Sequence, residues 1–498
     1  MSELCDLSAV ELRRLIGAKQ ISPVELMESC LTRIEHVNPA VNAMVAMDET
    51  RARAGAKDAE AKVMRGEALG ALHGLPLGIK DLDETEGMRT TYGSPLFKDN
   101  VPKADSAMVA KLRAAGAIVI GKTNTPEFGA GANTRNTVYG ATGNPFDTTK
   151  SAAGSSGGSG AALACGMVPI ASGSDTGGSL RNPAAFNGIV GFRPSPGIVP
   201  SEKRGLGWSN LPVLGPMARN VPDAALMFSV MADDDARDPL AYTLHGKPGR
   251  GVPEWYFPQA QIDLGTLRVA ATPDLGFTPT EKHIRRVFAS RVSALKPLFG
   301  TLAEATPDCA GADEAFEILR AANFLAGHLK KVQDTPGMVG PNVVENVKEG
   351  LGYTLADYAR AGTLQTAMYR RWQTFFRDYD VIITPGITLS PRPWRELYPA
   401  EIDGQPTRTY FHWLSLSYAA TLVGHPALCL PLGLDEKGMP FGLQIIGPRG
   451  GDALVLQVAA AIEAAVAKDP VLKRPVPDIA ALKVAQPIAD MDEFLSWG

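Results

Sequence analysis

The segment Ser151-Ala-Ala-Gly-Ser-Ser-Gly-Gly-Ser-Gly160 is the densest run of glycine and serine in the chain, and Gly173-Ser-Asp-Thr-Gly-Gly-Ser-Leu-Arg181 follows it closely. Such runs are typical of flexible linkers. Here, however, the first segment runs directly into a helical pattern at 159–165 and a buried strand-like run at 168–175. A flexible linker has no place between two packed elements, so we interpret both segments as loops of a folded site.

Two other interpretations of these loops rest on shorter patterns. Consecutive glycine amides can bind phosphate, but neither loop contains a complete GxxxxGK[ST] or GxGxxG pattern. Gly154-x-Ser156-x-Gly158 fits the GxSxG pattern of a nucleophilic serine, yet His73 and His425 lie in apolar stretches that favour a structural role. The SxxK motif Ser293-Ala-Leu-Lys296 lies in a helical segment without a KTG partner, which argues against a serine–lysine acylase of that type.

Short apolar runs broken by glycine and proline surround these loops. They read as buried strands at 75–81, 117–123 and 168–175, with helix-like segments at 106–115 and 159–165 between them. Strand-like runs return at 381–385, 427–431 and 442–447, followed by a helix that begins near Asp452. The alternation of strands and helices predicts an α/β sheet covered by helices on both faces, with catalytic loops at the strand ends.

The chain shows no internal repeat and no long linker, which favours one large α/β/α domain over residues 1–498. Ser8 and Ser22 each precede a glutamate by three residues, so both are predicted helix caps. We expect an N-terminal helical layer (1–65), a region with the catalytic motifs (70–230), a variable and mostly helical insertion (231–375), and C-terminal strands and a helix that complete the sheet (376–498).

Composition excludes several classes of protein. Lys and Arg number 49 and Asp and Glu 53, a formal charge of −4, so the chain lacks the basic bias of a nucleic-acid-binding protein. Apolar residues make up 45%, as in a folded protein. The five cysteines form no CxxC pair, which predicts reduced core thiols and no metal site. Without a signal-peptide pattern or a membrane-spanning run, we expect a cytoplasmic protein that binds neither membrane nor nucleic acid.

Lys80 ends the apolar run Leu75-Pro-Leu-Gly-Ile-Lys80. An ammonium group is costly to bury there unless it is paired or neutral. One interpretation is a salt bridge to Asp81 or Asp83. The other is a lysine whose pKa is low enough for it to accept a proton from a serine where no histidine can do so.

Three segments together resemble the amidase signature family of serine hydrolases: residues 74–94, 121–147 and 152–197. Weaker matches follow at 215–227, 380–386 and 438–448, so the resemblance covers nearly the whole chain. It implies a mixed β-sheet sandwiched between helical layers. It also implies Ser179 as the nucleophile, Ser155 as a bridging serine that follows a cis peptide bond after Gly154, and Lys80 as the terminal base.

The same resemblance implies supporting roles around these three residues. Backbone N–H groups of Thr176, Gly177, Gly178 and Ser179 would form an oxyanion hole. Ser156, Asp175 and Arg181 would support the loops, although a plain structural ion pair explains Asp175 and Arg181 equally well. The chain departs from the family pattern at Ala153, at Asn187 and at Arg193-Pro-Ser195, none of which is a proposed catalytic position.

The function implied is hydrolysis of a carboxylic amide through an acyl-enzyme on Ser179, with no metal or organic cofactor. The partner would be a small-molecule amide, and many relatives pair into homodimers. The alternatives are the catalytic A-type subunit of a glutamine-dependent tRNA amidotransferase, and a non-catalytic binding protein with the same fold.

The sequence leaves the substrate open. We expect the residues that determine specificity in the variable regions 200–215, 310–345 and 400–415. Five aromatic residues are candidates for a pocket wall, although ordinary packing would account for each of them: Trp208, Phe324, Tyr353, Tyr410 and Trp413.

Overall fold

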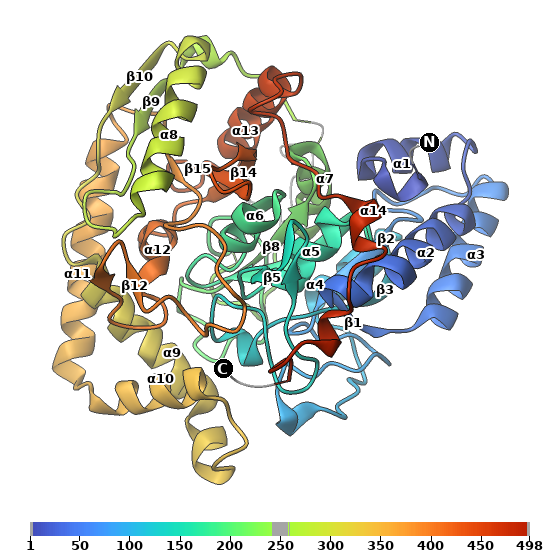
Figure 1. The fold of residues 1–498 in the computed structure, drawn as a ribbon, viewed down its shortest axis with the longest axis horizontal. Helices are drawn as coiled ribbons and strands as arrows, with labels where there is room; N and C mark the ends of the chain where they lie inside the picture. The colour runs from blue at the N-terminus through green and yellow to red at the C-terminus, as the bar shows by residue number, and fades with distance from the viewer. Residues whose placement is uncertain (1–2, 242–256, 258, 496–498) are drawn as a thin grey trace.

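The computed structural model describes residues 3–241, 257 and 259–495 (Figure 1). Its centre is an 11-stranded mixed sheet with the strand order β1-β3-β2-β6-β8-β7-β14-β15-β11-β9-β10. The strands span β1 Met44–Met47, β2 Pro76–Lys80, β3 Ile118–Thr123, β6 Ile170–Asp175, β7 Val190–Arg193, β8 Val213–Ala218, β9 Arg268–Ala271, β10 Thr301–Glu304, β11 Val381–Pro385, β14 Ala427–Leu434 and β15 Pro440–Ile446. Two small hairpins lie outside the sheet: β4 Gly143–Asn144 with β5 Asp147–Ser151, and β12 Glu401–Ile402 with β13 Gln405–Pro406.

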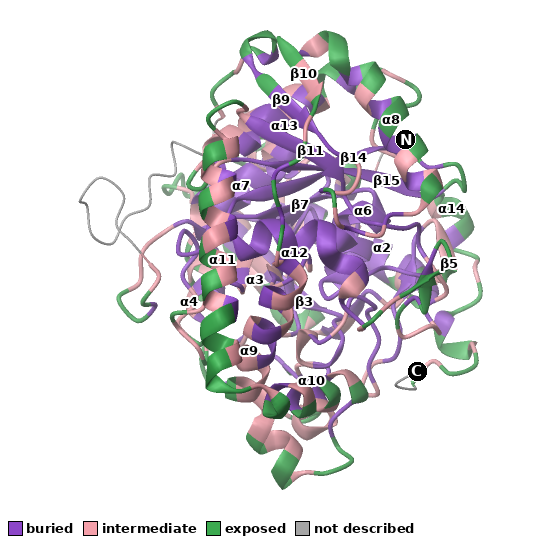
Figure 2. Cartoon of the chain, turned by 90° about the vertical axis from the view of Figure 1, so that its left-hand side faces the viewer, coloured by how far each residue is buried: buried purple, intermediate pink, exposed green. Residues whose placement is uncertain are grey.

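Helices flank this sheet, as the α/β/α prediction requires. In Figure 2 the buried strands occupy the middle, with α7 on one side and α6 on the other, and the exposed residues face outward. The helices are α1 Ala9–Gly17, α2 Pro23–Val41, α3 Glu49–Met64, α4 Ala107–Ala114, α5 Gly157–Ala164, α6 Arg181–Asn187, α7 Val221–Met231, α8 Lys282–Leu295, α9 Ala312–Asp334, α10 Pro341–Gly352, α11 Leu355–Phe375, α12 Ser415–Leu422, α13 Asp452–Val466 and α14 Ile479–Leu482.

The predicted strands and caps are confirmed. The runs at 75–81, 117–123 and 168–175 form β2, β3 and β6, and the C-terminal runs form β11, β14 and β15. Ser8 accepts a hydrogen bond from the N–H of Glu11, and Ser22 and Glu25 form a capping box at the start of α2. The C-terminal strands join the sheet begun early in the chain, because β14 pairs with β7.

The parallel strands β2 and β6 bring Lys80 and the loop after Asp175 to one edge of the sheet. β2 runs parallel to β6, with Leu77 opposite Ile170. Both strands therefore end at the same edge, β2 at Lys80 and β6 at Asp175. Loops that follow the carboxyl ends of parallel strands are the usual location of active sites in such folds.

The region 231–375 differs in part from its prediction. Helices α8 to α11 make it mostly helical, but β9 and β10 add two strands at one end of the main sheet. Each strand has only four residues, and β10 is half-exposed or exposed throughout, so neither leaves a clear apolar run in the sequence. Residues 242–256 and 258 of this region lie outside the described residues.

The described residues include no helix that is both long enough and apolar enough to span a membrane. The apolar stretch 453–467 lies within and just after α13, whose buried face includes Val455, Leu456 and Ile462. All five cysteines are buried and unpaired.

Candidate active site

Lys80 lies at the end of β2, with its side chain fully buried. Its Nζ atom lies 2.7 Å from Ser155 Oγ, 2.9 Å from Ser156 Oγ and 3.0 Å from Ser174 Oγ. No carboxylate of the described residues forms an ion pair with it. The salt bridge to Asp81 or Asp83 is therefore not present: Asp81 accepts from the Thr91 hydroxyl and N–H, and Asp83 accepts from the Ser172 hydroxyl.

Burial lowers the pKa of Lys80 to about 7, against the opposing attraction of the Asp83 and Asp175 carboxylates. Desolvation disfavours the charged amine, and the three surrounding hydroxyls are neutral. A neutral amine donates two hydrogen bonds and accepts one, which three hydroxyl neighbours can satisfy. The site therefore holds a lysine that can exchange a proton near neutral pH.

The two glycine–serine loops meet at Lys80. Ser155 follows a cis peptide bond from Gly154, and the Ser156 N–H donates to the Ser179 carbonyl at 3.3 Å. The Ser155 side chain is buried, whereas Ser179 is partly exposed and lines a cavity of about 180 Å³. The Ser179 hydroxyl has no hydrogen-bond partner within the described part of the chain. Thus Lys80 is hydrogen-bonded to Ser155 and Ser156. Ser179 contacts this cluster through its carbonyl and lines the cavity.

The loop that follows β6 forms part of the cavity wall. Thr176, Gly177 and Ser179 line it, and none of their N–H groups donates a hydrogen bond to another described residue. Gly178 differs, because its N–H donates to Asp175 Oδ1 at 2.9 Å. Its φ of 116° and the closeness of Asn182 leave no room for a side chain. Gly178 therefore positions the loop, and three amides remain for a developing oxyanion.

The buried carboxylate of Asp175 holds the loop 176–179 in place. It forms a buried ion pair with Arg181 (2.9 Å) and another with Arg193 (3.1 Å). Despite complete burial, these guanidinium groups and the Gly178 N–H hold the pKa of Asp175 well below its usual range. The pairing of Asp175 with Arg181 matches the structural interpretation. Arg193 stands out in the sequence only as a departure from the family pattern, because nothing local indicates its contact with residues on another strand.

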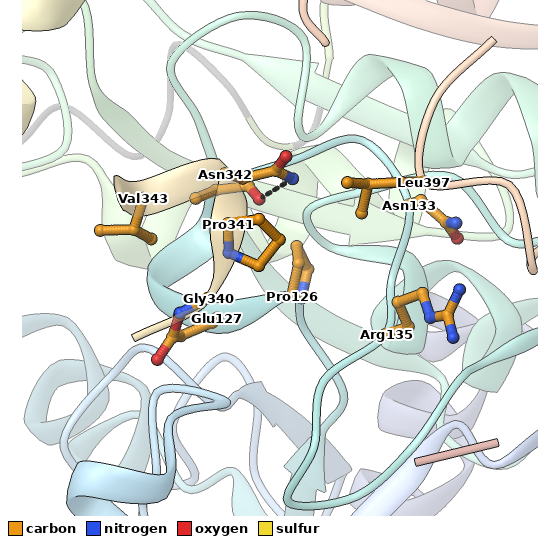
Figure 3. Close-up of a pocket in the computed structure, with 10 residues that line it drawn as sticks. Pro126, Glu127, Asn133, Arg135, Gly340, Pro341, Asn342, Val343 and Leu397 are labelled. Carbon is orange, nitrogen blue, oxygen red and sulfur yellow. Dashed lines mark hydrogen bonds between the residues drawn. The ribbon is translucent and has the colours of Figure 1, made fainter. Parts of the chain in front are cut away.

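Residues 126–135 separate the catalytic cavity from a second hollow of about 20 Å³, shown in Figure 3. Phe128, Gly129 and Gly131 line the catalytic cavity. Behind them, Glu127 accepts from the Ser94 hydroxyl (2.6 Å) and from the Gly340 N–H (2.7 Å) just before α10. In Figure 3, Asn342 reaches the same loop, donating to the Ala130 carbonyl at 2.9 Å. The cavity wall is thus attached to α10.

We expect Glu127→Ala to lower the free energy of unfolding by about 1–3 kcal/mol, because it leaves the Ser94 hydroxyl and Gly340 N–H without their acceptor in a buried place. Urea denaturation of purified variants measures this loss. Glu127→Gln is the matched control, since its one amide oxygen can still accept, and it should lose less. Equal stability of the alanine variant and the parent chain would contradict the anchoring role.

The cavity wall comes from the three predicted regions and one more. Pro212, Phe316 to His328, and Tyr410 to Leu414 belong to the regions 200–215, 310–345 and 400–415, whereas the Phe128 loop was not predicted. Of the candidate aromatic residues, Phe324 and Tyr410 line the cavity. Trp413 supports Tyr410 by donating to its carbonyl at 2.8 Å. Trp208 lines a separate hollow, and Tyr353 does not belong to the described lining of the cavity.

Two further wall residues were missed by the sequence analysis, Arg320 and His328. With Phe316 and Phe324 they recur every four residues along α9, a spacing that places them on one face of the helix. That spacing is visible in the sequence. The spacing alone, however, does not show that this face of the helix lines the cavity, and only the structure does.

Comparison with known proteins identifies the family of this chain. The Amidase family model matches residues 25–456. The chain is 35% identical over 461 residues to an acylamidase of Rhodococcus erythropolis, covering 92% of this chain and 95% of that protein. It is 36% identical over 478 residues to the A subunit of the glutamyl-tRNA(Gln) amidotransferase from Symbiobacterium thermophilum, covering 91% and 95%.

A solved bacterial aryl acylamidase of the amidase signature enzymes superposes with a TM-score of 0.84 at 28% identity, covering 92% of this chain and 96% of that one. A solved 6-aminohexanoate cyclic dimer hydrolase superposes with a TM-score of 0.81 at 25% identity, covering 98% and 99%. The family model spans most of the chain. The chain therefore belongs to the amidase signature family of hydrolases.

Proposed function

We propose that this chain is a self-sufficient amidase that cleaves the C–N bond of a carboxylic amide through an acyl-enzyme on Ser179. The observation that supports this most directly is the Lys80 amine, buried among three hydroxyls and without a carboxylate partner among the described residues. Such an amine can serve as a general base. Ser179 is the one serine in the described lining of the cavity, and no side chain of that lining forms a hydrogen bond with its hydroxyl.

In the first step the Ser179 hydroxyl attacks the amide carbon and forms a C–O bond. Its proton passes to Ser155, and the Ser155 proton passes to the neutral Lys80 amine at 2.7 Å. The N–H groups of Thr176, Gly177 and Ser179 stabilise the negative charge on the carbonyl oxygen. Loss of one such donor typically costs about 10²–10³ in rate.

In the second step the C–N bond breaks, and the proton returns from Lys80 through Ser155 to the leaving nitrogen. Water then attacks the acyl-enzyme with the same base, releasing the acid and restoring Ser179. Every proton taken up is given back, so the cycle needs no metal or organic cofactor.

The experiment is release of ammonia or amine by the purified chain alone, over aliphatic, aryl and peptide amides, with Ser179→Ala as control. Turnover that disappears in the variant supports the proposal. A folded chain that hydrolyses none of these amides would contradict it. That result would favour the amidotransferase alternative, since relatives of that name are about as similar in sequence as the acylamidase.

We expect kcat/KM to rise with pH and to level off above the pKa of Lys80, which is about 7. Below that pH the ammonium form predominates and cannot accept a proton, so the rate falls about tenfold per pH unit. A pH–rate profile with a neutral amide measures this limb. A profile that falls as pH rises through neutrality would contradict the assignment of Lys80 as the base.

A further inference from the structure

Arg320 is a buried cation in the wall of the catalytic cavity. The residue is only 6% exposed, and its Nη1 atom has no hydrogen-bond partner among the described residues. No carboxylate in the described part of the chain forms an ion pair with it. Buried arginines are normally paired or hydrogen-bonded. Arg181 and Arg193, the other fully buried arginines near the site, both have such partners.

Three aromatic rings hold the Arg320 guanidinium in place. Its central carbon lies 4.3 Å from the ring centroid of Phe324, 4.7 Å from that of Tyr410 and 4.6 Å from that of Phe411. Tyr410 is itself held, because its hydroxyl accepts from Asn346 at 2.8 Å. Contacts with ring faces stabilise the cation but leave its N–H groups unused. The cavity wall therefore holds the Arg320 guanidinium in a fixed position, and its N–H donors have no acceptor among the described residues.

The electrostatic surroundings leave this charge uncompensated. Burial lowers the pKa of Arg320 to about 9, and among the described residues Glu349 is the carboxylate that opposes this effect, from beyond ion-pair distance. Burial also lowers the pKa of His328, two helical turns along, to about 4, so its ring is neutral at pH 7. An anionic group that enters the cavity thus finds the Arg320 cation without a counter-ion from the described part of the chain, and Lys331 Nζ lies 5.6 Å from the ring centroid of Phe128, another wall residue.

Arg320 lies close to the nucleophile along α9. Phe316 packs against the nucleophile loop, since a Cβ atom at Gly177 would lie 2.9 Å from its ring. Arg320 comes four residues later on the same face, about 6 Å further along the helix axis. A substrate whose carbonyl lies at Ser179 can therefore reach Arg320 with a second group, and a short spacer joins that group to the carbonyl.

We propose that Arg320 binds a carboxylate in the acyl part of the substrate, so that the preferred substrates are monoamides of short dicarboxylic acids. This rests on the proposed amidase function. We assign the carboxylate to the acyl part because the leaving amine must depart before water attacks, whereas the acyl group stays bound to Ser179 at the cavity wall. The planar guanidinium can offer two parallel N–H groups to a carboxylate.

The test compares two anilides of equal length, glutaryl-p-nitroanilide and its methyl ester, as the ratio of their kcat/KM values. We expect the parent chain to prefer the free acid, and Arg320→Met to lower that preference by about 100-fold. Arg320→Lys retains the charge without the planar fork and should give an intermediate ratio. Lys330→Met, which removes a charge from an exposed position of the same helix, is the matched control.

The ratio cancels any general effect on catalysis, because the two probes share the same leaving group. Equal hydrolysis of both probes by the parent chain, or an unchanged ratio in Arg320→Met, would overturn the carboxylate assignment and leave the amidase proposal standing. If Arg320→Met does not fold, Arg320→Lys decides by the same ratio.

Calorimetric titration with glutarate provides a readout without turnover. Binding to the parent chain and at least tenfold weaker binding to Arg320→Lys are expected, with pentane-1,5-diol as the uncharged comparison of similar length. If neither anilide is hydrolysed, the panel of aliphatic, aryl and peptide amides still decides the amidase proposal, and glutarate binding decides the role of Arg320. Absence of glutarate binding to the folded parent chain would then reject it.

Discussion

Ser179→Ala is expected to lower kcat for amide hydrolysis by about 10⁶-fold, the loss typical of removing the nucleophile of a serine hydrolase. The variant retains the cavity and the loop amides but has no oxygen to attack the carbonyl. The rates of amine release by the parent chain and the variant, at saturating substrate, measure this change. Mass spectrometry of the parent chain with a p-nitrophenyl ester should show an acyl adduct that Ser179→Ala lacks.

The matched control for this variant is Ser293→Ala. Ser293 belongs to the SxxK motif, but it lies on an exposed face of α8 and makes no side-chain hydrogen bond to another described residue. Its removal should leave the rate unchanged. A Ser179→Ala variant that retains a tenth of the parent rate, or a chain that loses activity only in Ser293→Ala, would contradict the assigned nucleophile.

Lys80→Met and Ser155→Ala should each approach the loss seen for Ser179→Ala, because the three residues act as one proton path. Combining them should add little, since removal of any member interrupts the same path. Multiplicative losses in the double variants would mean that Lys80 and Ser155 act independently of Ser179.

Asp175→Ala is expected to lower the free energy of unfolding by about 3–5 kcal/mol, the usual cost of leaving a buried charge without its partner. Here two fully buried guanidinium groups, of Arg181 and Arg193, lose the same carboxylate. The loop also loses its attachment through the Gly178 N–H. Urea denaturation, followed by tryptophan fluorescence and by circular dichroism, measures the loss and tests whether unfolding is a single transition.

Asp380→Ala provides the matched comparison, because Asp380 pairs with Arg268 at 2.8 Å where both side chains are partly exposed. Exposed pairs contribute at most about 1 kcal/mol. If Asp175→Ala costs no more than Asp380→Ala, the buried cluster does not hold the loop. Asp175→Asn should fall between the two, since it keeps some hydrogen bonds but loses the charge.

Local patterns in the sequence predict the elements that carry the chemistry. β2, β3 and β6 are short apolar runs bounded by glycine and proline, and the caps of α1 and α2 are formed by residues three positions apart. Lys80 at the end of an apolar run predicts a buried amine, because the neighbouring apolar residues indicate that this strand is buried. The glycine–serine loops resemble a family whose motifs have that order along the chain.

The lining of the cavity could not be predicted in the same way. Arg320 and Tyr410 meet across 90 residues of chain, and Asp175 of β6 reaches Arg193 of β7 although β8 lies between these two strands in the sheet. Strands β9 and β10 were missed because four residues give too little periodicity. The choice between a salt bridge and an isolated amine at Lys80 also required the structure, since the partners of Asp81 and Asp83 lie elsewhere.

Sequence alone is therefore sufficient for the fold class, the family and the buried position of Lys80, because these depend on local patterns and on the order of motifs along the chain. The tertiary structure is needed for the occupied Gly178 amide, the second arginine on Asp175 and the uncompensated charge of Arg320. These features depend on which distant side chains share a low-dielectric interior, where the presence or absence of one partner determines the energy of a charge.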